Sequence, residues 1–380
     1  MTLEHATLPV PQFDQIQLPD LKQQIEQAIQ QGQHFLTTLT AVPSNFSAQL
    51  TLLDQVDQLE NNISECWGIL SHLNAVMNSA ETRELHQALL PALSEYYTQL
   101  GQHTLLYQSY QHIHDAAEFA TLSAAQQSAI KLALRDFKLS GVALEGATKT
   151  RYADISARLS QLSSDFSNHV LDATQAYVKP LSDAQLKGLP ANSVELLKQY
   201  GQQHQLSQAA ATLDIPAYMA IMTYADDRDV RAELYKAYTT RASDQSEYPA
   251  FDNSQVMEEI LSLRQEMAQL LGFNNYAELS LASKMAPDVA TVEQFLIDLA
   301  EHARVPAEKE VAELKAIALA DGIDDLQPWD TGYYSEKLKV QQYNLSQEAL
   351  KPYFPAPKIL QGLFSIVNRL YSINIVERQA

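Results

Sequence analysis

The sequence predicts an all-α protein, an elongated assembly of many helices with only minor, short β elements. Glycine is scarce, at 11 of 380 residues, while the helix-favouring residues Ala, Leu, Gln and Glu dominate. Apolar residues recur every three or four positions over most of the chain. No repeat of fixed period and no low-complexity linker interrupts this pattern, which favours packed helical bundles over a solenoid.

The first three predicted helices follow one another closely. Asp20 is a plausible cap for a helix over residues 20–40. Apolar positions at steps of three and four over residues 46–77 predict one helix of about eight turns with a single buried stripe. Ser79 caps a third helix, in which Pro91 is a possible kink.

Three more helices are expected before the pattern changes. They cover residues 103–118, residues 123–140 and the apolar positions between 152 and 170. Ser123 caps the second of them and Gly141 stops it, since serine is favoured before a helix and glycine after one.

The helical period then breaks, and this break sets the domain boundary. Residues 178–190 show no helical period, and residues 210–216 have the pattern of a short strand and turn. We therefore divide the chain into an N-terminal helical domain over 1–222 and a second part over 223–380.

Helices resume after this boundary. Asp226 or Asp227 can cap one of them, and residues 253–270 predict another. The amphipathic segment 288–320 contains Pro306, so it is either one kinked helix or two helices. A last helix begins at Pro355. Residues 372–378 then alternate like a strand, although no partner strand is evident.

Bulk composition excludes several classes of function. A formal net charge of −20 disfavours binding to nucleic acid, which requires clustered Lys and Arg. Cys66 is the single cysteine, so no intrachain disulfide can form. The N-terminus lacks a signal-peptide pattern, and no stretch approaches the roughly 20 apolar residues that span a membrane. We expect a cytoplasmic protein without membrane contact.

The strongest metal-like group is His112, Asp115 and Glu118, whose spacing places them on one side of a helix. A chance arrangement on a polar helix face explains them better, and an independent metal enzyme is the corresponding alternative function. The pairs Glu84 with His86 and Glu301 with His302 lack a second histidine one turn away. The zinc-protease pattern His-Glu-x-x-His is absent from all 380 residues.

Residues 141–148 match the glycine spacing of a phosphate-binding loop, but Ala147 stands in place of the lysine. They are better explained as a helix stop followed by a loop. The glycine patterns of dinucleotide-binding proteins and of serine hydrolases do not occur. From motifs alone, the sequence predicts no catalytic residue and no metal ligand.

One short stretch differs from the rest of the chain. Residues 326–337 combine Trp329, a proline, an aspartate and the pair Tyr333 and Tyr334. Packing at a junction between two helices explains them more simply than contact with a substrate. Composition also selects Arg241. We name Arg241, Tyr333 and Tyr334 as candidate residues for contact with a substrate, although a structural role explains each of them better.

Several blocks of sequence resemble the thimet oligopeptidase family of zinc metallopeptidases. The most specific is Leu-Gln-Pro-Trp-Asp at 326–330, followed by Tyr-Tyr-Ser-Glu-Lys at 333–337. Further blocks in the same order lie at 93–96, 134–141, 168–174, 212–216, 238–245, 256–261 and 350–355. The resemblance runs from about residue 7 to the last residue.

The resemblance implies a zinc-dependent endopeptidase that hydrolyses short intracellular peptides and excludes folded proteins. In this family a nearly all-helical body is split by a deep channel, and zinc is held there by His-Glu-x-x-His and a downstream glutamate. Residues 1–222 would form one channel wall, and residues 223–380 would form the first, incomplete part of the peptidase domain.

Because the zinc pattern lies downstream in the family, no zinc ligand or catalytic residue is carried over to this sequence. We expect a truncated N-terminal part of such an enzyme, inactive alone, with zinc in the full-length parent and none in this chain. Its partners would be short peptides and the missing catalytic half, and its exposed apolar surface would favour self-association. The alternative is a non-catalytic helical scaffold or peptide-binding protein.

Overall fold

The computed structural model describes residues 11–377 and confirms the predicted all-α class, with two short strands among the helices of these residues. They divide into two compact units. The first comprises residues 11–165 and 256–291, and the second comprises residues 166–255 and 292–377. None of the helices in the described part of the chain is both long and apolar enough to cross a lipid bilayer. The domain boundary after residue 222 stays a prediction.

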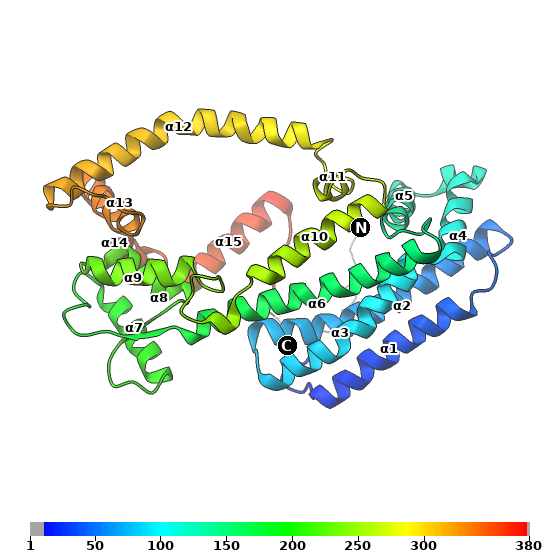
Figure 1. Cartoon of the computed structure of the whole chain (residues 1–380), viewed down its shortest axis with the longest axis horizontal. Coiled ribbons are helices and arrows are strands. Elements are labelled where there is room, and N and C mark those ends of the chain that lie inside the picture. Colours follow the sequence, from blue (N-terminus) through cyan, green and yellow to red (C-terminus); the bar gives the residue numbers. More distant parts are fainter. Residues whose placement is uncertain (1–10, 378–380) are drawn as a thin grey trace. The chain divides into compact units, whose positions relative to one another are not determined.

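In the first unit, α1 (Leu18–Thr38), α2 (Phe46–Val76) and α3 (Ala80–Gly101) pack side by side (Figure 1). Ile25, Ile63 and Leu70 are fully buried between them, and the Tyr96 hydroxyl donates to Glu60. Ser79 caps α3 as predicted. Asp20 does not cap α1, because the helix begins two residues earlier and Asp20 lies in its first turn.

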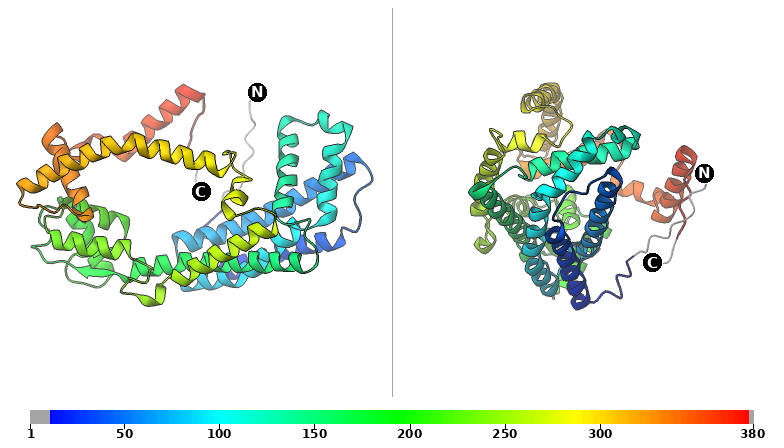
Figure 2. Two further views of the ribbon diagram at one scale, coloured as in Figure 1. Left: turned by 45° about the horizontal axis from the view of Figure 1, so that its top comes forward. Right: turned by 90° about the vertical axis from the view of Figure 1, so that its right-hand side faces the viewer.

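A second helical pair completes the other end of this unit. α4 (Thr104–Asp115) is followed by the 3₁₀ turn η1 (Ala117–Thr121), and α5 (Ala124–Leu139) returns alongside α4 (Figure 2). Ser123 caps α5 through a reciprocal pair of hydrogen bonds with Gln126, as the sequence predicted. Ile113 and Phe137 lie in the shared core.

Residues 146–165 of α6 (Gly146–Ala176) and residues 256–270 of α10 (Ser254–Leu270) also pack together in the first unit, with Ile155, Leu162 and Leu263 buried between them. Two bidentate ion pairs lie beside this core. Arg151 donates to Glu266 at 2.6 and 2.7 Å, and Arg158 donates to Glu259 at the same two distances. The short helix α11 (Tyr276–Leu281) follows.

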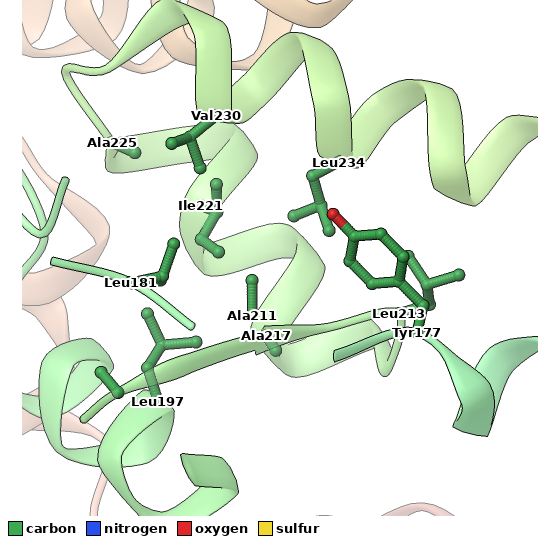
Figure 3. Packing of buried hydrophobic residues seen from close by; sticks show 11 residues of the cluster. Tyr177, Leu181, Leu197, Ala211, Leu213, Ala217, Ile221, Ala225, Val230 and Leu234 are labelled. Atoms are coloured by element: carbon green, nitrogen blue, oxygen red, sulfur yellow. The ribbon is translucent and has the colours of Figure 1, made fainter. Parts of the chain in front are cut away.

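The second unit contains the two strands. β1 (Val178–Pro180) pairs antiparallel with β2 (Ala210–Thr212), with Lys179 opposite Ala211. The predicted strand near residue 210 is therefore confirmed. Helices α7 (Ala191–Gln203), α8 (Ile215–Tyr224) and α9 (Arg228–Thr239) surround the strands. Their buried side chains point toward one another, with Leu197, Ile221 and Leu234 fully enclosed (Figure 3).

The 3₁₀ turn η2 (Pro249–Phe251) precedes α10, and the long helix α12 (Val289–Ala320) follows α11. Pro306 lies inside α12, so the alternative of two separate helices is wrong. A proline interrupts one backbone hydrogen bond, and Figure 1 shows α12 as a single bent helix.

Four elements close the described chain. α13 (Pro328–Tyr343) is followed by α14 (Gln347–Leu350), the 3₁₀ turn η3 (Lys351–Tyr353) and α15 (Ala356–Tyr371). Ser372 adopts a left-handed conformation that ends α15. Residues 372–377 form no strand, because an alternating pattern gives a strand only where a neighbouring strand accepts its hydrogen bonds. Residue 378 lies outside the described residues.

Candidate functional site

The distinctive stretch 326–337 forms the start of α13. Pro328 opens the helix, and the backbone N–H of Gln327 donates to Asp330 Oδ2 at 3.0 Å. Asp330 therefore faces back to the helix N-terminus, where the positive end of the helix dipole favours a carboxylate. The side chain of Asp330 is fully buried.

Two arginines of α9 converge on this carboxylate. Arg231 Nη2 donates to Asp330 Oδ1 at 2.8 Å, and Arg228 Nη2 donates to Asp330 Oδ2 at 2.9 Å. Arg231 is itself only 2 % exposed and also donates to the carbonyl of Ala225 at 2.6 Å. Burial alone would raise the pKa of Asp330, but the hydrogen bonds from Arg228 and Arg231 hold this pKa below its ordinary value. The carboxylate thus stays charged and joins α9 to α13.

The tyrosine pair lies beside this ion pair. The guanidinium of Arg231 sits 4.2 Å from the centre of the Tyr333 ring, and the Tyr333 hydroxyl donates to Asp226 Oδ1 at 2.8 Å. Tyr333 and Tyr334 are 9 % and 2 % exposed, in a core shared with residues of α12. The structure therefore places both rings in the packing between α9, α12 and α13, and a contact with substrate stays a prediction for them.

Arg241, the third candidate residue, lines a different feature. A cavity of about 140 Å³ lies in the second unit. The residues around it come from the end of α6 and the residue before β1, from the residue after β2, from α9 and from the loop after α9. They include Tyr177, Glu233, Lys236, Arg241, Glu247 and Tyr248, but neither Tyr333 nor Tyr334.

The cavity has charged groups of both signs on an aromatic wall. The Arg241 guanidinium lies 4.0 Å from the ring centre of Tyr238, which stacks on Tyr218. Glu233 accepts hydrogen bonds from the Tyr177 hydroxyl and from Lys179. Burial, together with the nearby Glu233 carboxylate, raises the pKa of Tyr177. A cavity of this size suits one amino-acid-sized group with a carboxylate or an ammonium, and not a whole peptide.

Sequence reasoning named Arg241, whose contact with a substrate stays a prediction, and did not select Tyr177 and Glu233, which line the same cavity. Tyr177 and Glu233 are 56 positions apart and meet because α9 packs over the β1–β2 pair. No spacing in the sequence signals such a contact.

The proposed metal group around His112 is not assembled. Helix α4 ends at Asp115, and Ala116 is extended, so Glu118 does not continue the helical spacing. Asp115 instead accepts from Gln111 at 2.8 Å and contacts His114 at 2.9 Å. Among residues 11–377, no three His, Cys, Asp or Glu side chains are arranged to hold a metal ion, so these residues do not fit a catalytic zinc.

The glycine-rich segment 141–148 joins α5 to α6. Gly141 and Gly146 both have positive φ, at 76° and 53°, a backbone region that glycine adopts without strain. The segment thus serves as the helix stop and loop that its sequence favoured.

Two family models match the chain. The model described as "Neurolysin/Thimet oligopeptidase, N-terminal domain" matches residues 23–149, and the model described as "Peptidase family M3" matches residues 221–380. Among solved structures, one described as "PZ peptidase A with inhibitor 2" has a TM-score of 0.50 at 16 % identity, over 85 % of this chain and 48 % of that chain. That similarity concerns the fold alone.

Curated relatives are much closer in sequence. "Oligopeptidase A" of Escherichia coli (strain K12) is 46 % identical over 95 % of this chain and 52 % of its own length. "Oligopeptidase A" of Haemophilus influenzae is 44 % identical over 97 % of this chain and 54 % of its own length. "Probable cytosolic oligopeptidase A" of Arabidopsis thaliana is 32 % identical over 96 % of this chain and 53 % of its own length.

This chain spans about half the length of these relatives. The match to the Escherichia coli relative nevertheless extends over nearly all of this chain. The N-terminal-domain model and the peptidase model match it one after the other along the sequence. The chain therefore belongs to the thimet oligopeptidase family, peptidase family M3.

Proposed function

We propose that the chain is part of a zinc-dependent oligopeptidase that hydrolyses short peptides and excludes folded proteins. The observation that carries this proposal is the 46 % identity to a protein named Oligopeptidase A over 95 % of the chain. The M3 family match, which covers residues 221–380, supports a peptidase independently of that relative.

Within such an enzyme, residues 1–222 act as the N-terminal helical domain and one wall of the peptide channel. Residues 223–380 begin the peptidase domain. The two family models support this division, since the match to the N-terminal domain ends at residue 149 and the peptidase match starts at residue 221.

This polypeptide alone does not hydrolyse peptides. The pattern that supplies two zinc ligands and the general base does not occur in its sequence. The described residues offer no arrangement that could hold the metal. We therefore derive no catalytic step from them, and their contribution is to bind and enclose the substrate.

Arg241 and its cavity receive one end of the peptide. A guanidinium donates two parallel hydrogen bonds to a carboxylate, and the aromatic surface of Tyr238 holds Arg241 in place. Tyr333 and Tyr334 act indirectly, by fixing α13 against α9.

The compartment is the cytoplasm, as the name of the Arabidopsis relative says of that protein. Besides short peptides, the chain associates with further copies of itself through apolar side chains exposed on α15.

Hydrolysis of a quenched fluorescent peptide tests the proposal. The purified chain with added zinc should give no cleavage. Addition of the C-terminal half of the Escherichia coli relative should restore cleavage that a chelator abolishes. Chelator-sensitive cleavage by the chain alone would contradict its proposed inactivity.

A chain that binds peptide but recovers no activity with any catalytic half would instead favour a non-catalytic peptide-binding protein. Peptide binding by the recombined halves should be measured in parallel, so that failed assembly is distinguished from an assembled but inactive complex.

A further inference from the structure

A groove with an empty volume far larger than the Arg241 cavity lies in the first unit. It has a volume of about 790 Å³ and opens between the ends of α1 and α3, the start of α4 and the first turns of α6. Its lining is part apolar and part charged, and includes Leu36, Glu95, Gln102, Leu105, Lys149 and Asp154. No part of the proposed peptidase function uses it.

The side chain of Gln102 carries a hydrogen-bond donor without a partner in this groove. Gln102 is only 6 % exposed, and its Nε2 atom is buried with no acceptor in reach. A buried amide N–H without an acceptor is unfavourable, and native proteins seldom leave one unless a ligand or water completes it. The terminal torsion of glutamine is soft, so the amide can turn Nε2 to an acceptor in the groove.

The backbone of Gln102 is fixed in position. Its N–H bonds to the carbonyl of Thr98, and its carbonyl accepts from Lys149 Nζ at 3.0 Å. The preceding Gly101 lies so close to Ser140 that a Cβ atom there would stand 2.6 Å from the serine Cβ. Lys149 is thus held next to Gln102 and keeps two further N–H groups for a ligand.

The neighbouring His103 is already committed to the fold. Its Nδ1 accepts from the backbone N–H of Leu106 at 3.2 Å, so Nε2 carries the proton and donates to the carbonyl of Leu36 at 3.0 Å. The donors that remain for a ligand are therefore the amide of Gln102 and the ammonium of Lys149.

We propose that this groove binds the C-terminal end of a short peptide. The peptide carboxylate bonds to Gln102 and Lys149, and an apolar side chain lies on Leu36 and Leu105. The exposed carboxylates of Glu95 and Asp154, on the same lining, receive the peptide's N-terminal ammonium. A free zwitterionic di- or tripeptide, and not a simple carboxylic acid, satisfies all of these groups.

Calorimetric titration of the full chain with the dipeptide Ala-Leu tests the proposal. It should bind saturably to the native chain and to the Arg241→Met variant, which separates this site from the cavity of the proposed function. The amide Ala-Leu-NH₂ should bind at least tenfold more weakly because it lacks the carboxylate. N-acetyl-leucine should also bind more weakly because it lacks the ammonium.

Two variants locate the site. Gln102→Met keeps the side-chain length and removes the unpartnered donor, so in the Arg241→Met background it should weaken Ala-Leu binding at least tenfold without lowering the melting temperature. Lys149→Met should weaken binding to a similar extent. The exposed Gln58→Met on α2 is the matched control and should change neither property.

Three results would overturn the assignment. They are no binding of Ala-Leu, equal binding of its amide or of N-acetyl-leucine, and loss of binding in Arg241→Met alone. A Gln102→Met variant that melts at a lower temperature yet binds normally would show that a buried water satisfies the amide, which also rejects the site. Because binding is the readout, failure of the peptidase proposal leaves this result unchanged.

Discussion

Asp330 shows what a single residue contributes that sequence reasoning did not reveal. Its position beside Trp329 indicated an aromatic packing site, which the burial of Tyr333 and Tyr334 agrees with. Its ionic partner Arg228 lies 102 positions away, and Arg231 lies 99 positions away. Only the packing of α9 on α13 brings them together, so the ion pair could not be predicted from spacing.

Replacing Asp330 by Asn should destabilise the protein by about 3–5 kcal/mol at neutral pH, because Arg231 would remain buried without its counterion. The folded-state pKa of Asp330 is lowered, so its contribution is present above the unfolded value of about 3.9 and is lost as the pH falls through the folded value. Urea unfolding at several pH values measures this difference.

The exposed Asp244→Asn is the control for this substitution and should change stability by less than about 0.5 kcal/mol. A cost for Asp330→Asn that stays constant down to pH 2 would show that the charge is not responsible.

Arg241 can be tested in the same way for peptide binding. In the Gln102→Met background, which removes the groove site, Arg241→Met should weaken binding of a peptide with a free carboxylate by about tenfold or more. It should lower stability by only about 0.5–1 kcal/mol through loss of its contact with Tyr238. Arg264→Met is the matched control, since Arg264 lies 4.9 Å from the Tyr276 ring, outside the residues that line the cavity. Equal loss of binding in both variants would contradict a specific contact.

At the scale of elements, the apolar period predicted where helices lie better than where they end. Helix α2 and the caps Ser79 and Ser123 were predicted because a long period and a cap residue are local signals. The extended Ala116 after α4 carries no such signal, so the spacing that placed His112, Asp115 and Glu118 on one helix face does not hold in the structure. The pairing of β1 with β2 is a long-range contact, and the strand pattern indicated only β2.

Two helix glycines allow a matched test of packing. In α7, a Cβ at Gly201 would stand 2.0 Å from the carbonyl oxygen of Gln208, and this backbone cannot move aside as a side chain would. Gly201→Ala should therefore destabilise the protein by about 1–3 kcal/mol. In α2, nothing lies within 4 Å of a Cβ at Gly68, so Gly68→Ala should stabilise by about 0.5–1 kcal/mol. Thermal unfolding of both variants measures these changes in stability. A change of the same sign in both variants would refute the packing argument.

At the scale of the whole molecule, composition predicted the helical class, whereas the division into units was not predicted. Each unit is built from two separate parts of the sequence, 11–165 with 256–291 and 166–255 with 292–377. A boundary inferred from a break in periodicity divides the chain only once. Membership of the peptidase family came from blocks of sequence in order, since the described residues hold no metal cluster that would have indicated the chemistry.

The apolar residues of α15 lead to a prediction about assembly. Leu363, Ile366 and Leu370 are 50 %, 56 % and 66 % exposed, and together they form a stripe on one helix face. We expect concentration-dependent self-association in sedimentation velocity, reduced by the double substitution Leu363→Glu and Leu370→Glu. Substitution of the polar Gln361 and Ser365 by Glu is the control, and a monomer at all concentrations would contradict the expectation.

The ion pair between α9 and α13 also bears on how the protein folds during synthesis. Arg231 leaves the ribosome before Asp330, and the intervening residues take about 5–20 s to translate at typical rates of roughly 5–20 residues per second. During that interval the core around Ile221 and Leu234 can form, but Arg231 has no carboxylate from α13 to neutralise it. The second unit can therefore be completed only after α13 has been synthesised.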